Sequence, residues 1–189
     1  MIRKLAQLIV FSLFTSASYA VALAAPGDEK ALGLNYSVVK VHISTKNGHH
    51  GIGSGVVVKE NHIATNCHVV ANARSMHVTK LGQRFSPVAL KADWKHDLCI
   101  LQFNDLPLTP VKLGSAKALK YEQPVFSISF PNNARKPLTT YGSVKALYPL
   151  DDSLIIRSTA DFRMGASGGA LFDESGQLVG IISFKSPGR

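Results

Sequence analysis

The hydrophobic positions after residue 36 come in short runs whose alternation fits β-strands. The first run, SVVKVHI at residues 37–43, alternates apolar and polar positions and is rich in β-branched side chains. Further runs of about four to eight residues follow, separated by Gly, Asn, Lys and Pro. No stretch has the apolar period of a long amphipathic helix. The pattern therefore predicts an all-β fold, either an antiparallel barrel or a sandwich.

A looser segment, NDLPLTPVKLGSAKALK at residues 104–120, interrupts the strand pattern near the middle of the chain. It contains two Pro and one Gly, and it separates two groups of predicted strands. Two antiparallel sub-barrels that are joined at this segment fit the arrangement. We therefore expect one β-barrel over residues 25–115 and a second over residues 116–189.

The beginning of the chain has the layout of a secretory signal peptide. Arg3 and Lys4 precede an apolar stretch, and small-residue cleavage sites end at Ala20 and at Ala24. We expect a signal peptide over residues 1–24 with cleavage after Ala24, and Ala20 is the second choice. The alternative is an uncleaved anchor, because the apolar stretch is almost long enough to span a bilayer. Cleavage predicts a secreted or periplasmic protein that has no membrane contact afterwards.

The chain is basic, with 21 Lys and Arg against 12 Asp and Glu and a formal net charge of +9. A basic protein can bind nucleic acid or anionic membranes. Here the basic residues are scattered, as the positions of Lys91, Lys95, Lys112, Lys117 and Lys120 show. This spacing favours a solvated basic surface over a nucleic-acid partner.

The motif GASGGALFD at residues 165–173 is the strongest chemical signal in the sequence. Ser167 lies among glycines, and such a backbone can fold tightly and direct N–H groups to one point. An oxyanion hole requires this arrangement, and each of its donors lowers a reaction barrier by about 3 kcal/mol. The alternative is a glycine-rich β-turn without catalytic function.

Two further residues are candidates for proton transfer and its support. His68 lies in TNCHVV, and a neutral imidazole can accept a serine proton near neutral pH. Asp97 lies in KHDLCILQF, directly before an apolar strand. A carboxylate that enters a core is costly unless it is paired, and an imidazole N–H is a suitable partner. The alternative is an ordinary aspartate at the end of a strand.

The three residues occur in the order His68, Asp97, Ser167, which is the chain order of chymotrypsin-like enzymes. The segments GSGVVV, IATNCHVV, HDLCIL and GASGGALFDESGQLVGIIS resemble blocks of that family in the same order. The chain therefore resembles a trypsin-like serine protease of the chymotrypsin fold, in the bacterial branch that includes the HtrA proteases and the glutamyl endopeptidases. The resemblance covers roughly residues 37–185. It implies two antiparallel β-barrels of the six-stranded type, the second incomplete at its C-terminal end.

The resemblance also implies roles for individual residues. Ser167 corresponds to the nucleophile, His68 to the general base and then acid, and Asp97 to the residue that orients the imidazole. The backbone N–H groups of Gly165 and Ser167 correspond to the oxyanion hole. Ser183 matches a position that supports Asp97.

Substrate binding is assigned in the same way. Ser183, Phe184 and Lys185 match the substrate-binding strand of the family. Asp161 lies six residues before Ser167, where trypsin-like enzymes carry an acidic residue at the base of the specificity pocket. The alternative is that this loop follows the bacterial variants, in which that position does not reach the pocket.

The favoured function is an exported serine endopeptidase that hydrolyses polypeptide substrates through an acyl-enzyme. The alternative is a catalytically silent homologue that binds peptides or protein partners. A zinc or redox site at Cys67, His68, Asp97 and Cys99 is a third hypothesis, but the C-x-x-C spacing typical of such sites is absent. We therefore expect neither a metal nor a cofactor.

The two cysteines are expected to form a disulfide bond. If Asp97 contacts His68, the backbones around both residues lie close together. Cys99 shares a strand face with Asp97, and Cys67 adjoins His68, so their Cα atoms can fall within the bridging range of roughly 4.4–6.8 Å. The alternative is a pair of buried, reduced thiols.

Overall fold

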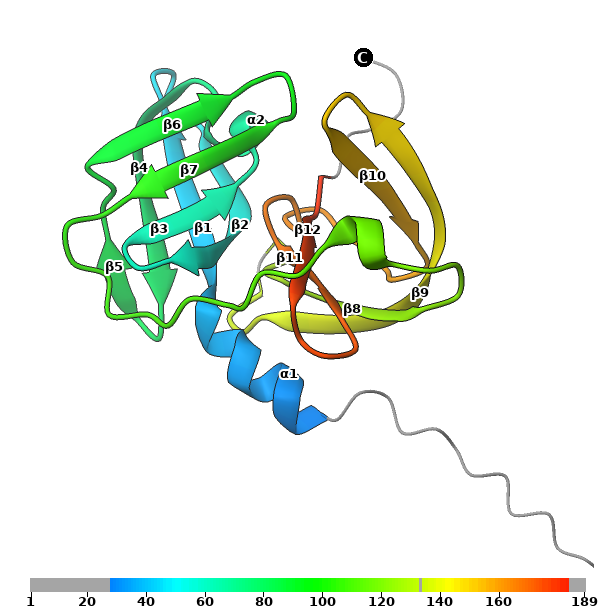
Figure 1. The fold of residues 1–189 in the computed structure, drawn as a ribbon. Helices are drawn as coiled ribbons and strands as arrows, with labels where there is room; N and C mark the ends of the chain where they lie inside the picture. Colours follow the sequence, from blue (N-terminus) through cyan, green and yellow to red (C-terminus); the bar gives the residue numbers. More distant parts are fainter. Residues whose placement is uncertain (1–27, 133, 184–189) are drawn as a thin grey trace, which may run out of the picture.

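The computed structural model describes residues 28–132 and 134–183. The proposed signal peptide, Phe184 and Lys185 lie outside these described residues. Two lobes, each built on an antiparallel sheet, lie side by side (Figure 1). The helical segments are short: α1 (Asp28–Leu34), the 3₁₀ turn η1 (Asn35–Ser37), α2 (Cys67–Val70) and the 3₁₀ turn η2 (Ala116–Ala118). The predicted all-β fold is therefore confirmed.

The first sheet has seven strands in the order β5-β4-β1-β2-β3-β7-β6. Their bounds are β1 (Val38–Thr45), β2 (His50–Lys59), β3 (His62–Thr65), β4 (Ala73–Lys80), β5 (Gln83–Phe85), β6 (Ala89–Asp93) and β7 (Leu98–Gln102). The alternation along β1 has the expected result, since Val39 and Val41 are fully buried while Lys40 and His42 are only partly buried. Val57, Ile63 and Leu101 complete the centre of this core.

The second sheet has five strands in the order β10-β9-β8-β11-β12. Their bounds are β8 (Pro124–Ser129), β9 (Leu138–Leu150), β10 (Ser153–Ser158), β11 (Ala170–Asp173) and β12 (Leu178–Ile181). The stacked rings of Phe126 and Phe172, with centroids 5.3 Å apart, fill the centre of its core. The described residues thus form seven strands in the first sheet and five in the second. In the first sheet, the short hairpin strand β5 extends the sheet beyond β4.

The two lobes share apolar packing at their junction. Val38, Val56 and Ala64 of the first sheet belong to the same buried cluster as Phe126 and Phe172 of the second. These side chains point away from the first lobe's own core, because neighbouring residues on a strand face opposite sides. The segment that connects β7 to η2 also crosses both lobes: Val111 N–H donates to Val57 O, and Gly114 N–H donates to Leu178 O. The lobes are therefore held in one fixed arrangement.

The two cysteines link the end of β3 to β7. Thr65 pairs with Cys99 across the sheet, so Cys67, two residues later, begins α2 directly beside β7. The two Sγ atoms are 2.05 Å apart and the two Cα atoms are 4.9 Å apart. Both residues are fully buried in the first core. Among the described residues, no group of three or more His, Cys, Asp or Glu side chains is arranged so that it could hold a metal ion.

We expect Cys67 and Cys99 to be disulfide-bonded in the isolated protein. The residues are 32 positions apart, and closing a loop of that length stabilises a fold by about 3–4 kcal/mol in the chain-entropy model. A reductant should therefore lower the free energy of unfolding of the wild type, measured by urea titration, by about this amount. The Cys67→Ala/Cys99→Ala variant, which has no bond to lose, should not respond to the reductant. Two reactive thiols in the denatured, unreduced wild type would contradict the bond.

Candidate active site

The start of α2 is fixed against the turn that connects β6 to β7. Cys67 N–H donates to Asp97 O at 3.2 Å, and Asn66 Nδ2 donates to the same carbonyl at 3.0 Å. Asp97 has a φ of 55°, a left-handed conformation that aspartate tolerates better than most residues. This backbone geometry places both Asp97 O and the Asp97 carboxylate next to α2. His68, the second residue of α2, is thus held at the edge of the first lobe.

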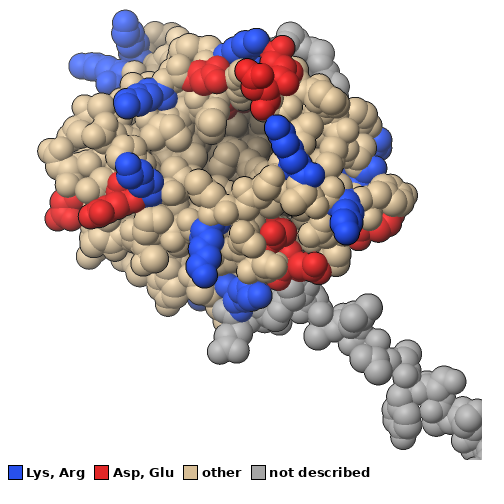
Figure 2. Space-filling model, in the orientation of Figure 1, with Lys and Arg blue, Asp and Glu red and all other residues tan. Residues whose placement is uncertain are grey.

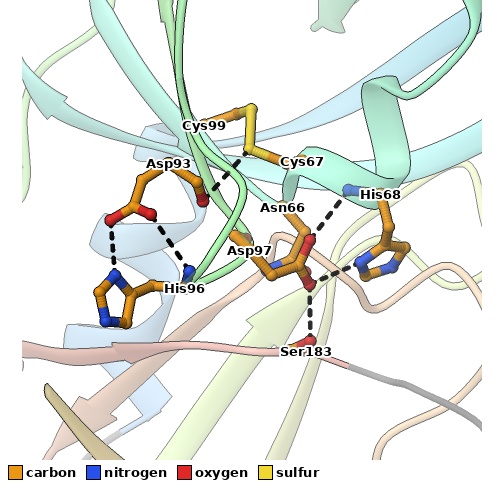
Figure 3. The surroundings of a disulfide bond; sticks show 8 residues. All are labelled: Asn66, Cys67, His68, Asp93, His96, Asp97, Cys99 and Ser183. Carbon is orange, nitrogen blue, oxygen red and sulfur yellow. Dashed lines mark hydrogen bonds and ion pairs between the residues drawn. A yellow bond between two sulfur atoms is a disulfide. The ribbon is translucent and has the colours of Figure 1, made fainter. Parts of the chain in front are cut away.

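The Asp97 carboxylate accepts three hydrogen bonds that come from distant parts of the chain (Figure 3). His68 N–H donates to Oδ1 at 2.9 Å, and His68 Nδ1 contacts Oδ2 at 2.7 Å. Ser183 Oγ donates to Oδ2 at 3.0 Å. Only 7% of the Asp97 surface is exposed. The structure thus brings His68, Asp97 and Ser183 together.

The protonation state of Asp97 follows from two opposing effects. Burial by itself would raise the pKa of Asp97, but the hydrogen bonds from His68 and Ser183 to the ionised form outweigh burial, and the pKa lies below its ordinary value. Asp97 is therefore a carboxylate at neutral pH. A carboxylate at this position requires the proton on His68 Nδ1 and leaves Nε2 as the ring nitrogen that can accept one.

Ser167 lies in a tight loop between β10 and β11. The backbone at two positions of this loop has a conformation that favours glycine. Gly165 and Gly168 have φ values of 93° and 83°. A Cβ atom at position 168 would lie 2.0 Å from Ser54 O, so a larger residue cannot fit there. The loop is closed by hydrogen bonds from Ala166 N–H to Arg163 O and from Gly169 N–H to Ala166 O, both at 2.8 Å. The glycine-rich motif is thus required for the turn around the serine.

The serine loop is fastened to the first lobe through Ser54 of β2. Ser54 N–H donates to Ser167 O at 2.8 Å, and Ser54 Oγ donates to Gly165 O at 2.9 Å. Ser54 Oγ also accepts a hydrogen bond from Phe130 N–H at 2.8 Å. The structural roles of Ser54 and Asn66 were not predicted from the sequence. The available signal was a polar residue within an apolar run, GSGVVV, because a buried hydroxyl needs hydrogen-bond partners.

Two further contacts place Ser167 at the same junction as His68 and Asp97. Gly168 N–H donates to Ile182 O and Ile182 N–H donates to Gly169 O, and the next residue is Ser183, the partner of Asp97. A Cβ atom at Gly53 would lie 2.5 Å from the side chain of Val69, the neighbour of His68, and 3.2 Å from Ser167 O. The segments that carry His68, Asp97 and Ser167 therefore converge where the two lobes meet.

A groove of about 400 Å³ opens beside Asp97 and Ser183. Its other walls are mainly apolar and include Leu154, Phe162 and Ile181. Figure 2 shows the surface hollowed between the two lobes, with acidic and basic side chains interspersed around it. An extended chain with apolar side chains fits a groove of this lining.

The structure places Asp161 away from the groove walls. Its carboxylate is two-thirds exposed and pairs with Arg163, with 3.3 Å between Oδ2 and Nε. The neighbouring residue, Phe162, lines the groove instead. This arrangement favours the alternative given above, in which the loop follows the bacterial variants.

Comparison with known proteins gives one consistent result. The family described as "Trypsin-like peptidase domain" matches residues 53–181. The chain is 35% identical over 146 residues to "Protease Do-like 1, chloroplastic" of Arabidopsis thaliana, a match that covers 69% of this chain and 32% of that protein. It is 28% identical over 170 residues to "Serine endoprotease DegS" of Haemophilus influenzae, covering 86% of this chain and 50% of that protein. The chain thus spans between about a third and a half of the length of these relatives.

Solved structures agree with the sequence relatives. An HtrA-type protease, AlgW with tripeptide, has a TM-score of 0.72 at 25% identity, with 80% of this chain and 52% of that chain covered. The active form of the Rv3671c protease from M. tuberculosis has a TM-score of 0.71 at 24% identity, with 93% and 82% covered. The latter similarity shows the fold alone, and it is the fold that the sequence comparison predicted. On the family match, the relatives and the shared fold together, the chain belongs to the trypsin-like peptidase family, with HtrA-type serine proteases among its relatives.

Proposed function

We propose that this protein is an exported serine endopeptidase that cleaves polypeptides through a covalent intermediate on Ser167. The observation that carries the proposal is the buried, ionised Asp97, which contacts His68 Nδ1. Ser183, beside the serine loop, donates a hydrogen bond to the same carboxylate. The His68 side chain is 37% exposed, so the imidazole that Asp97 orients stays accessible from solvent. Membership of a peptidase family supports the same function.

In the proposed mechanism, Ser167 Oγ attacks the carbonyl carbon of the scissile peptide bond. His68 Nε2 accepts the hydroxyl proton, and the negative charge of Asp97 stabilises the imidazolium that results. The C–N bond then breaks, and the imidazolium gives its proton to the departing amine. The acyl group remains on Ser167 as an ester. A water molecule attacks this ester in the same way, with His68 again as the base, and Ser167 is released.

The serine loop is suited to stabilise the oxyanion of each tetrahedral intermediate. We assign the backbone N–H groups of Gly165 and Ser167 as its donors, because both lie in the tight turn that the left-handed φ of Gly165 permits. These two donors form the proposed oxyanion hole. Gly165 is held in place by Ser54 Oγ, and a Cβ atom there would lie 2.6 Å from Asn132 N. The donors are therefore preorganised before the substrate binds.

The proposed substrate is a polypeptide in extended conformation, bound with apolar side chains in the groove between the lobes. A tripeptide is bound in one of the similar solved structures, AlgW. The proposed site of action is the periplasm or the exterior of the cell. The relative from Salmonella typhimurium, 31% identical over 139 residues, is called "Periplasmic serine endoprotease DegP". A disulfide between the two cysteines would fit an oxidising compartment.

Replacement of Ser167 by Ala should abolish peptide hydrolysis. Loss of the nucleophile lowers kcat by about 10⁴-fold or more in enzymes of this mechanism. Casein hydrolysis measures turnover, and a fluorophosphonate probe reports the activated serine directly. The matched control is Ser115→Ala, which removes an exposed hydroxyl from the connecting segment and should label like the wild type. Wild-type turnover by a folded Ser167→Ala protein would exclude the proposed mechanism. A wild type that neither cleaves nor labels would indicate a silent homologue.

Asp97→Asn should slow catalysis and change how stability depends on pH. The asparagine keeps the shape of the side chain but cannot hold the imidazole in the required tautomer, so kcat should fall by about 10⁴-fold. The pKa of Asp97 lies below its ordinary value of 3.8 in the folded chain. The ionised carboxylate therefore stabilises the fold above that pH, and the contribution is lost as the pH falls through the folded pKa.

Thermal unfolding of the wild type and Asp97→Asn between neutral pH and about pH 3 tests this expectation. The difference in Tm should be largest at neutral pH and should shrink below about pH 4, where Asp97 becomes protonated. A difference that is independent of pH would mean that the charge of Asp97 does not stabilise the fold.

A further inference from the structure

A second cavity, away from the proposed active site, is lined by cationic side chains. Its volume is about 440 Å³, and it lies between the ends of β1 and β4 and the segment 134–137. Lys40, Lys80, Arg135 and Lys136 line it together with His42. No Asp or Glu of the described residues is part of this lining. A cavity with four full positive charges and no carboxylate is attractive to an anion.

Lys80 is the buried member of this set. Only 6% of its surface is exposed, and its Nζ donates to Asn35 O and, at 2.6 Å, to Val38 O. Nζ also lies 5.5 Å from the centre of the Phe130 ring. Within the described part of the chain, Lys80 forms no ion pair, so carbonyl dipoles and aromatic faces alone offset its charge. An ammonium has three N–H donors, and the two carbonyls occupy two of them. One donor remains for a ligand in the cavity.

The pKa values of two lining groups are lowered by burial and, for His42, also by neighbouring positive charges. Burial lowers the pKa of Lys80 to about 8, so the residue is still mostly protonated at neutral pH. Burial also lowers the pKa of His42, and the charges of His77, Lys40 and Arg84 lower it further. Both groups therefore bind a proton less readily than usual. A bound anion would raise both pKa values, because a nearby negative charge favours the protonated forms.

The cavity walls are held by contacts of their own. Lys40 Nζ donates to Ala134 O at 3.1 Å, which fastens the start of segment 134–137 to β1. His42 Nε2 lies 2.9 Å from Thr79 Oγ1, and its ring stacks on His77 with 4.7 Å between centroids. These contacts fix the lining of the cavity without adding negative charge. The arrangement has the features of a preformed site rather than of mobile surface lysines.

We propose that this cationic cavity binds a small phosphate-bearing molecule that carries at least two negative charges. A single carboxylate would leave most of the four charges unmatched, whereas a diphosphate offers several acceptor oxygens and more than one charge. Lys80 would bind it at the buried wall, and Arg135 and Lys136, which are exposed, would close over it from the solvent side. The volume accommodates a group larger than a single phosphate.

The cavity shares a wall residue, Phe130, with the hydrogen-bond network that holds the serine loop. Phe130 lines the cavity, and its N–H donates to Ser54 Oγ, which in turn donates to Gly165 O. Asn132 N–H donates to Met164 O at 2.8 Å. A ligand in the cavity would therefore contact the segment 130–132, which is hydrogen-bonded to Ser54 and to Met164 beside the serine loop.

Calorimetric titration of the purified protein with inorganic pyrophosphate at pH 7 and low salt tests the proposal. We expect saturable binding at one site. The Arg135→Gln/Lys136→Gln variant changes exposed residues only and should weaken binding by about tenfold or more. Lys80→Met should abolish binding. The matched control, Lys117→Met, removes an exposed lysine from η2 and should bind like the wild type.

Flotation with vesicles that contain cardiolipin, a lipid whose headgroup carries two phosphates, distinguishes a lipid source of the phosphate from a soluble one. Flotation that is lost in the Arg135→Gln/Lys136→Gln variant and is displaced by pyrophosphate supports the site with a lipid headgroup as its ligand. Pyrophosphate binding without flotation supports it with a soluble ligand. The proposal is overturned if neither probe binds, or if the double variant and Lys117→Met bind both probes as tightly as the wild type.

Discussion

The arrangement of the proposed site depends on one buried carboxylate. Asp97 is nearly inaccessible to solvent, and an isolated charge in that position would be very costly. The ionised carboxylate therefore requires hydrogen-bond donors. His68 of α2 and Ser183, which follows the last strand of the second sheet, provide them. Satisfying the carboxylate thus fixes the position of the imidazole and ties the second lobe to the first. The electrostatic requirement and the proposed catalytic geometry are met by the same contacts.

Close backbone approach is the second requirement, and glycine meets it. The serine loop contacts β2 so closely that a side chain at Gly168 would overlap Ser54 O. This approach lets Ser54 bind the loop with both its N–H and its hydroxyl. A loop built from larger residues would stand further from β2 and could not form these two hydrogen bonds. The shared apolar cluster behind these contacts keeps the two lobes from separating.

The two buried charged residues of the described chain, Asp97 and Lys80, have different kinds of partner. Asp97 has charge-assisted hydrogen bonds that lower its pKa, whereas Lys80 has only carbonyls and aromatic rings around it, and its pKa falls because burial is not offset. The first is the expected state of a buried charge. Lys80 also lines a cavity with three further Lys and Arg side chains, and this cationic lining is the basis of the proposed anion site.

Much of the fold and of the candidate site could be predicted because the signals are local. Alternation of apolar residues indicated the strands, and the order of His68, Asp97 and Ser167 with the glycines around Ser167 indicated the family. Residues whose role depends on distant partners gave no comparable signal. Ser54 and Asn66 look like ordinary polar residues until β2, the serine loop and the β6–β7 turn are brought together.

The sequence alone determined the all-β class, the family and the identity of the residues proposed for catalysis, because periodicity and motif spacing are properties of neighbouring positions. Only the tertiary structure decided which of these groups are buried. Lys80 lies at the end of an ordinary amphipathic strand, yet it is buried against Asn35 of η1 and the Phe130 ring. Asp161 lies six residues before Ser167, yet its side chain is largely exposed and pairs with Arg163. Burial and electrostatic pairing depend on residues far apart in sequence, and these contacts form only when the chain folds.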